Sequence, residues 1–292
     1  MSISVSYTKY SNKKNSVNLV LFTDEKFDAP KLRKHLLNSE YSFISDLLKM
    51  SDLSKKMLSF DISSKRKIIL VSIKKNLKNF EAENLGAEFY DQFKDLKNNI
   101  FSLNSDTLTI KSKKLIGHFL HGIKLKSYKF DKYKTKKSKQ NISIFVTGEN
   151  IPNIQDRQKF AAIEEGTFYT RDLVSEPGNI LHPDEYSKRL NSLKKYGLKI
   201  NIYDEKKLKK LGMNTLLGVG QGSIRGSYLV TMEWNGLKDK SKPLAFVGKG
   251  VCFDTGGISL KPAKFMEDMT YDMAGSAVVV GLMKSLALRK AK

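Results

Sequence analysis

The feature that most constrains this chain is a glycine-rich stretch at residues 247–275, which reads VGKGVCFDTGGISLKPAKFMEDMTYDMAG. It begins at the end of an apolar, strand-like run at 243–248, and it leads into a helical pattern. Within it lie two lysines and two aspartates, Lys249, Asp254, Lys261 and Asp272. Carboxylates and lysines delivered by loops at strand ends suit a hydrolytic metal site with a built-in electrophile. The sequence therefore predicts a strand, a functional loop and a helix in succession.

Strand-like and helical patterns alternate along the first half of the chain. The apolar runs that predict strands lie at 16–22, 67–73, 107–110 and 142–146. The clearest helical pattern has apolar residues at spacings of three and four, at Ala82, Leu85, Phe89, Phe93 and Leu96. This alternation predicts an α/β layer architecture for a small N-terminal domain, residues 1–150.

A second domain, residues 151–292, is predicted after the Gly, Asn and Pro residues of 148–153. A helix should follow and end before Pro177, since proline and glycine stop helices. Strand-like runs at 198–203, 227–234 and 243–248 then predict a doubly wound α/β domain. In such a fold the functional loops lie at the carboxyl ends of the strands.

Composition limits the cellular setting and the partners. One cysteine, Cys252, excludes an intramolecular disulfide, and the N-terminal sequence has no apolar signal segment. No apolar run is long enough to span a membrane, so we expect a cytoplasmic protein with no membrane partner. The net charge is +22, but the basic residues are mostly lysine rather than the arginine that phosphate recognition favours.

An alternative reading is a non-catalytic, basic module that binds nucleic acid. The densest basic run, KLKSYKFDKYKTKKSK at 124–139, interleaves aromatic residues with lysines, as single-stranded nucleic acid binders do. A solvated helix end followed by a linker explains the same run, so we expect no nucleic-acid role. A fragment that does not fold by itself is a third reading.

The chemistry of residues 249–272 is that of a divalent metal site. The ordinary pKa of lysine, about 10.4, keeps the amine protonated at neutral pH. A cation held by Asp254 and Asp272 would favour the neutral amine of Lys249, which could then act as a ligand. Lys261 would stay charged and stabilise an oxyanion. A glycine-rich turn with solvated lysines, and a helix N-terminus that favours Asp272, remain the structural alternatives.

This stretch closely resembles the signature of the leucyl aminopeptidase (cytosol aminopeptidase) family of dinuclear metallopeptidases, VGKGxxFDxGGxxLKPxxxMxxMxxDMxG. Three further blocks resemble the family in the same order, HGIKLKSYKFDKYK at 121–134, RDLVSEPGN at 171–179 and MNTLLGVGQGS at 213–223. Small departures are Thr270, where lysine is common, and Ser276.

The resemblance implies an aminopeptidase that acts on peptides with a free N-terminus, with leucine-like residues preferred. It implies metal ligation by Lys249, Asp254 and Asp272, with Asp254 shared between two ions. It further implies a catalytic role for Lys261 and a place for Met269 in the pocket for the first substrate side chain. Two Mn or Zn ions per subunit, a homohexamer, and an N-terminal domain with an oligomerisation or regulatory role are also implied.

The family's second signature, NTDAEGR, does not occur in this sequence. In the family it supplies an Asp and a Glu that complete the metal sites and an Arg that helps to activate the water. The final helical pattern ends in SLALRKAK without a Gly, Asn or Pro stop. We therefore expect a C-terminally truncated catalytic domain, which binds at most one divalent ion weakly and does not hydrolyse peptides alone.

Other signals are expected to be structural. A dinucleotide fingerprint that begins at Gly218 and Gly220 needs its third glycine at position 223, where Ser223 stands, so Gly218, Gly220 and Gly222 predict a tight turn. His118 and His121 have no acidic or cysteine cluster beside them in the sequence, so they are expected to be packing or surface residues.

Overall fold

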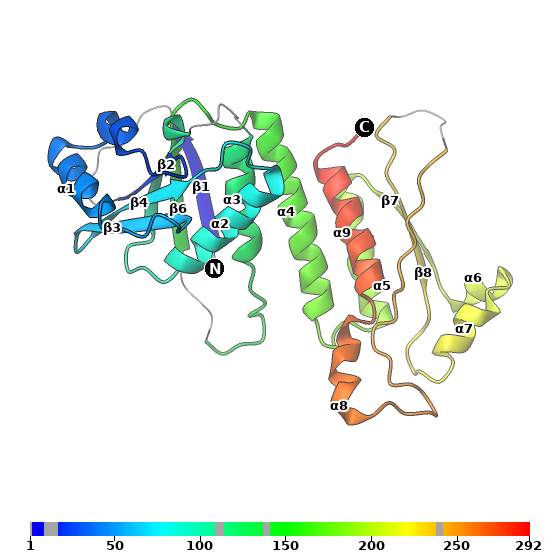
Figure 1. Ribbon diagram of the computed structural model, residues 1–292. Helices are drawn as coiled ribbons and strands as arrows, with labels where there is room; N and C mark the ends of the chain where they lie inside the picture. The colour runs from blue at the N-terminus through cyan, green and yellow to red at the C-terminus, as the bar shows by residue number, and fades with distance from the viewer. Residues whose placement is uncertain (1, 9–16, 109–113, 137–140, 238–241) are drawn as a thin grey trace. The chain divides into compact units, whose positions relative to one another are not determined.

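The computed structural model describes residues 2–8, 17–108, 114–136, 141–237 and 242–292. The chain divides into two compact units, Met1–Arg157 and Gln158–Lys292 (Figure 1). The α/β class predicted from the sequence is confirmed. The functional roles assigned to the two predicted domains stay predictions.

Unit 1 contains a six-stranded sheet in the order β1-β6-β5-β2-β4-β3. Its strands are β1 (Ser2–Thr8), β2 (Asn18–Thr23), β3 (Met57–Ser63), β4 (Arg66–Ser72), β5 (Ile100–Asn104) and β6 (Asn141–Thr147). All neighbours pair in parallel except β3 and β4, which form an antiparallel hairpin with a register shift between Asp61 and Ser63. Every residue of β2 is buried, as a central parallel strand covered on both faces requires.

Helices cover both faces of this sheet. On one face α2 (Asn79–Phe93) and α3 (Leu115–Lys126) pack with alternate strand residues such as Val20 and Phe22. On the other face the 3-10 helix η1 (Ala29–His35) and α1 (Asn38–Leu48) pack against Leu19 and Leu21. Alternate side chains of β2 therefore point to opposite faces of the sheet and pack into two different hydrophobic cores.

Unit 2 is mainly helical. Its elements are α4 (Ile154–Ser175), which begins in unit 1, α5 (Pro183–Asn191), η3 (Ser192–Tyr196), β7 (Lys199–Tyr203), α6 (Glu205–Lys210), α7 (Asn214–Gly220), β8 (Leu229–Glu233), α8 (Ala263–Met266), η4 (Glu267–Tyr271) and α9 (Ala274–Leu288). Strands β7 and β8 pair antiparallel. The core gathers around α9, with Met273, Ala277 and Val280 buried.

Helices α4 and α9 approach each other closely at two glycines. A Cβ atom on Gly281 would lie 2.0 Å from Thr170 Oγ1, and one on Gly166 would lie 2.4 Å from Gly281 O. Thr170 Oγ1 also donates a hydrogen bond to Ala277 O at 3.0 Å. Only glycine allows this approach of the backbones.

Two of the predicted strands are wrong in their described residues. Residues 243–248 form no strand, and Leu244 and Val247 are exposed, because no described strand pairs with this run. Residues 105–107 form the 3-10 turn η2 (Ser105–Thr107) instead of a strand, and residues 109–110 of that predicted strand lie outside the described part. Thr107 Oγ1 closes the turn by donating to Asn104 O and accepting from Phe22 N–H.

The end of α9 is closed without a Gly, Asn or Pro residue. The helix ends at Leu288, and Lys290 adopts the left-handed conformation with φ of 49°. The backbone N–H groups of Lys290 and Ala291 donate to Ala287 O and Leu286 O. These bonds satisfy the last carbonyls of the helix, a role that glycine usually fills.

The stretch Ala263–Leu288 is long and apolar enough to cross a membrane by length and composition alone. It is not one continuous helix, however, since it comprises α8, η4 and α9. Met273, Ala277 and Val280 of this stretch are buried in the core of unit 2, which is the pattern of a core helix.

Candidate metal centre

Residues 248–250 run along the first turn of α9. A Cβ on Gly248 would lie 2.5 Å from Ser276 Cα, so only glycine fits there. The N–H of Ser276 donates to Lys249 O at 2.9 Å, and the Ser276 hydroxyl shares a hydrogen bond with Tyr186 of α5. These contacts hold the Lys249 backbone beside the residues that lead into α9.

Lys249 and Asp272 form an ion pair in this arrangement. Lys249 Nζ lies 2.7 Å from Asp272 Oδ1, and the aspartate side chain is 18% exposed. The hydrogen bond from Lys249 to Asp272 is the main cause that raises the pKa of Lys249, so the ammonium form is favoured. Ligation of a metal by the neutral amine, as predicted from the sequence, would require this pair to open.

The second oxygen of Asp272 is buried, and no described residue forms a hydrogen bond with it. A buried carboxylate oxygen without a partner is unfavourable, and such groups in native proteins usually have an explanation. A divalent cation would satisfy this oxygen, and an oxygen-rich donor set suits several divalent metals. The residues present therefore fit a metal ion at Asp272.

Asp254 lies in a tight loop formed by glycines. Its Oδ1 accepts a hydrogen bond from Gly256 N–H at 2.8 Å, and Lys261 N–H donates to Thr255 O at 2.9 Å. Gly256 and Gly257 both have positive φ, 89° and 72°. A Cβ on Gly256 would also lie 2.4 Å from Ser259 O, so the loop needs glycine there on both grounds.

The loop brings Lys261 back to Asp254. Lys261 Nζ lies 2.8 Å from Asp254 Oδ2 and 3.0 Å from Met269 Sδ. The hydrogen bond from Lys261 is the main cause that lowers the pKa of Asp254, and the charge of Lys249 contributes in the same direction. The predicted catalytic lysine, one predicted ligand and the predicted pocket residue are therefore neighbours.

The five predicted site residues thus fall into two contact groups, Lys249 with Asp272 and Asp254 with Lys261 and Met269. The groups are linked electrostatically, because Asp254 contributes to the raised pKa of Lys249. Across the described residues, no three His, Cys, Asp or Glu side chains gather as a metal-binding group. The centre therefore offers two carboxylates and an amine, and the ligand roles stay predictions.

Residues 168–292 match the model of the cytosol aminopeptidase family, catalytic domain. A probable cytosol aminopeptidase of Brucella suis is 52% identical over 179 residues, which cover 59% of this chain and 36% of that protein. One of Caulobacter vibrioides is 50% identical over 177 residues, with the same coverage of 59% and 36%.

Residues 168–292 resemble the catalytic domain of the cytosol aminopeptidase family. The family resemblance predicted from the sequence is thereby confirmed, and the matching relatives are named as aminopeptidases. The chain spans about a third of the length of these curated relatives.

Solved structures of cytosol aminopeptidases share the fold. A mutant of tomato leucine aminopeptidase superimposes with a TM-score of 0.75 at 21% identity, covering 98% of this chain and 59% of that one. The cytosol aminopeptidase of Coxiella burnetii gives a TM-score of 0.72 at 20% identity, covering 97% and 57%. The bottromycin maturation enzyme BotP in complex with Mn gives 0.69 at 20% identity, covering 94% and 56%.

The remaining sequence signals have structural explanations. His118 pairs with Glu83 at 2.7 Å on the helices of unit 1, and His121 is buried. Cys252 is buried within the signature stretch, and burial raises the pKa of its thiol to about 12, so it is a packing residue rather than a thiolate. Gly218 and Gly220 belong to α7, and only Gly222 lies in a turn, which follows the helix.

Proposed function

We propose that this chain carries part of the active site of a metal-dependent aminopeptidase, which releases N-terminal amino acids, leucine-like ones preferred, from peptides. The observation that supports the proposal is the buried Oδ2 of Asp272, which has no partner among the described residues and lies beside Lys249 within the signature segment of a peptidase family. The activity is proposed for the whole protein, because the chain covers only 36% of the Brucella suis relative.

In this proposal Lys249, Asp254 and Asp272 hold divalent metal. When bound, such a metal supplies a Lewis acid and a water molecule of lowered pKa. The residues of the chain would position it: Asp272 from a half-buried place before α9, and Asp254 from the glycine loop. Binding requires Lys249 to leave its ion pair with Asp272 and Lys261 to leave Asp254.

Lys261 is proposed as the catalytic electrophile. Its side chain is about one-third exposed, and its ammonium pairs with Asp254. Once released from Asp254, it can donate a hydrogen bond to the oxygen of the peptide carbonyl, on which negative charge develops during attack. Met269, in contact with Lys261, would line the pocket for the first side chain of the substrate.

Several finer points are part of the same proposal. The metal is Mn or Zn, two ions per subunit in the intact enzyme, and the related fold of BotP was solved in complex with Mn. The intact protein is proposed to be a cytoplasmic homohexamer. The 292 residues by themselves are proposed to bind at most one ion weakly and to leave leucine p-nitroanilide unhydrolysed, a proposal that rapid release of nitroaniline would contradict.

The metal ligands can be tested on this chain by isothermal titration with Mn²⁺. Removing the charge of Asp272 in the variant Asp272→Asn should weaken Mn²⁺ binding about tenfold or more, because it removes a ligand oxygen. The matched control is Asp268→Asn, which removes the same charge from an exposed position nearby. Equal Mn²⁺ affinity of the two variants would contradict the ligand role of Asp272.

A further inference from the structure

A second site lies in unit 1, where two neighbouring parallel strands end. After β2 the chain turns to η1 and α1 on one face of the sheet, whereas the helix that follows β5, α3, lies on the opposite face. The carboxyl ends of β2 and β5 therefore diverge at a topological switch point. Ligands of open α/β sheets bind in the crevice that this divergence creates.

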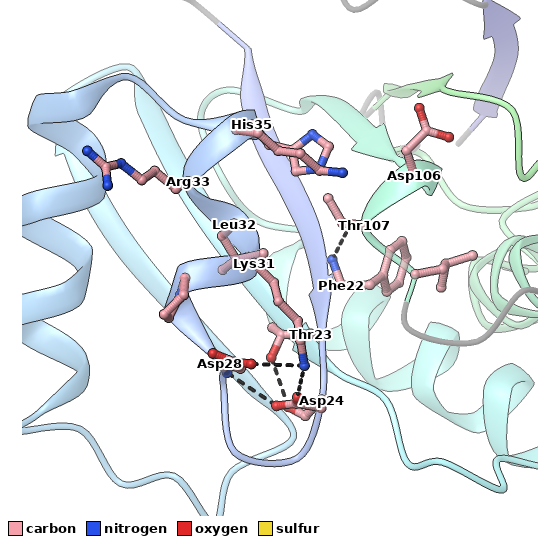
Figure 2. A pocket seen from close by; sticks show the side chains of 13 residues that line it. Phe22, Thr23, Asp24, Asp28, Lys31, Leu32, Arg33, His35, Asp106 and Thr107 are labelled. Carbon is pink, nitrogen blue, oxygen red and sulfur yellow. Dashed lines mark hydrogen bonds and ion pairs between the residues drawn. The ribbon is translucent and has the colours of Figure 1, made fainter.

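A cavity of about 580 Å³ occupies this place, between the end of β2, η1 and the turn after β5 (Figure 2). This volume is in the range of small-molecule sites. Pro30, which is exposed, contributes apolar surface from η1, whereas the side chains of Phe22, Leu108 and Leu32 pack into the cores on the two faces of the sheet. The remaining lining residues are polar or charged, so the cavity combines a small apolar surface with hydrogen-bonding and charged groups.

A hydrogen-bond chain fixes the proton on His35. The N–H of Asp106 donates to Asn104 Oδ1 at 3.0 Å, which orients the Asn104 amide. The amide nitrogen Nδ2 then faces His35 Nδ1 at 3.1 Å and donates to it. Because Nδ1 accepts, the neutral ring carries its proton on Nε2, and Nε2–H is a donor available to a ligand.

Two opposite charges flank this imidazole. Lys34 and Asp106 both line the cavity, and both act electrostatically on His35. Asp106 Oδ1 accepts from Glu149 N–H at 2.7 Å, which holds the carboxylate in place and leaves Oδ2 for another donor. Lys31, by contrast, already pairs with Asp24 and Asp28 at 3.0 and 2.8 Å, as Figure 2 shows.

The loop after β2 argues against a nucleotide. It reads TDEKFDAP, with three carboxylates and no glycine. A phosphate-binding loop at such a place is rich in glycine, so that backbone N–H groups can approach the phosphates. Carboxylates at this position would also repel a polyphosphate. A small ligand with one negative and one positive group suits the rim better.

We propose that this cavity binds a free α-amino acid with an apolar side chain. Its carboxylate would lie at Lys34 and the Nε2–H of His35, its ammonium at Asp106, and its apolar side chain against Pro30 of η1. The physiological role of this amino-acid site rests on the proposed function. If the protein is an aminopeptidase, the bound amino acid is a product of the reaction, and unit 1 would sense it. The binding itself does not depend on catalysis.

The test is titration of the 292-residue chain with leucine in EDTA, which prevents any contribution from the metal centre. Two analogues isolate the charges: 4-methylpentanoate lacks the amine, and isopentylamine lacks the carboxylate. We expect leucine to bind and each analogue to bind about tenfold more weakly, since each loses one ionic contact. Amide resonances of His35 and Thr107 should shift on titration with leucine.

Substitutions of residues that line the cavity test whether leucine binds there. Lys34→Met and Asp106→Asn should each weaken leucine binding about tenfold, while Lys55→Met, an exposed lysine outside the cavity, should not. Shifts of the His35 and Thr107 resonances in the unaltered chain test the proposal even if a variant fails to fold.

Three results would overturn the proposal: no leucine binding up to about 10 mM, equal binding of 4-methylpentanoate, or leucine binding that is lost in Asp272→Asn but kept in Asp106→Asn. Loss of Mn²⁺ binding or of peptide hydrolysis would instead count against the proposed function alone.

Discussion

Asp272 illustrates what a single residue can reveal beyond its place in a motif. From the sequence, its position before a helix has an ordinary explanation in the helix dipole. The structure adds that one oxygen pairs with Lys249 while the other is buried without a partner among the described residues. The dipole does not account for an unsatisfied buried oxygen, whereas a cation does. The metal hypothesis therefore gains its physical support at this atom.

Lys290 offers a residue-scale test of stability. It has a left-handed backbone, which costs an L-residue about 1–2 kcal/mol and glycine almost nothing. Lys290→Gly should therefore raise the free energy of unfolding of unit 2 by about 0.5–1 kcal/mol, after the larger entropy loss of glycine is counted. Urea denaturation measures the change.

The neighbouring variant Arg289→Gly serves as the control for Lys290→Gly. Arg289 has an ordinary φ of −83°. Glycine there should lower the free energy of unfolding by about 0.5–1 kcal/mol. A loss of stability in both variants would show that the left-handed residue is not under strain.

His35 links the stability of unit 1 to pH. Burial is the main cause that lowers its pKa below the ordinary value of 6.5; Lys34 acts in the same direction and Asp106 opposes it. Above pH 6.5 both the folded and the unfolded chain hold the ring neutral. As the pH falls below 6.5, the unfolded chain takes up the proton first, so the free energy of unfolding decreases.

We therefore expect urea midpoints of unit 1 to fall between pH 7.5 and 5.5, and to fall less in the variant His35→Gln, which cannot titrate. Comparing the two pH profiles isolates His35 from the other histidines. Parallel profiles would show that the buried ring does not contribute.

At the scale of elements, the contact between α4 and α9 is set by glycine. Gly281→Ala places a methyl group 2.0 Å from Thr170 Oγ1 and 2.6 Å from Gly166 O, so the helices must separate. We expect the free energy of unfolding to fall by about 1–3 kcal/mol, as for an overpacked core. Thermal or urea denaturation measures this loss.

Gly218→Ala provides the matched control for the helix contact. Gly218 lies in α7, and no atom of the described residues beyond its chain neighbours and its own helix backbone lies within 4 Å of the place that a Cβ would take. Alanine there should leave the stability unchanged or raise it by up to about 1 kcal/mol. Similar losses in both variants would contradict the close approach of α4 and α9.

The elements that the sequence predicted well have local and periodic signals. The spacing of Ala82, Leu85, Phe89 and Phe93 is that of a helix, and all four residues are buried on α2. The missed strands β1, β3 and β5 depend on distant partners instead. β1 pairs with β6, so Ile3 lies opposite Ile142. No local pattern encodes that pairing.

The same distinction explains the site. The signature segment identified Lys249, Asp254, Lys261 and Asp272 as candidate site residues, because their spacing can be read directly from the sequence. Their pairing as Lys249 with Asp272 and Lys261 with Asp254 follows from loop closure at Gly256 and from contacts at Ser276, which spacing does not encode. The cavity at His35 was likewise absent from the sequence predictions, since β2 and β5 become neighbours only in the sheet.

At the scale of the whole molecule, the net charge of +22 should cause only non-specific attraction to nucleic acid. Part of the basic run has a structural use: Lys124 Nζ donates to Ile3 O, and Lys126 pairs with Asp91. Residues 137–139 of the run lie outside the described part.

We expect duplex and single-stranded DNA to bind in about 50 mM salt and to be released near 200 mM, as counterion release dictates. Electrophoretic mobility shifts at several salt concentrations measure this dependence. A complex that persists at physiological salt and prefers one sequence would instead favour the nucleic-acid module as the function.

The irregular register of β3 with β4 has a consequence for self-assembly. β3 is the last strand of its sheet, and regular, flat strands in that position readily recruit a strand from another molecule. The shift between Asp61 and Ser63, with the charged Asp61 among the exposed residues, makes this border a poor template. A hexamer formed through unit 1 would therefore join its subunits elsewhere than by continuing the sheet past β3.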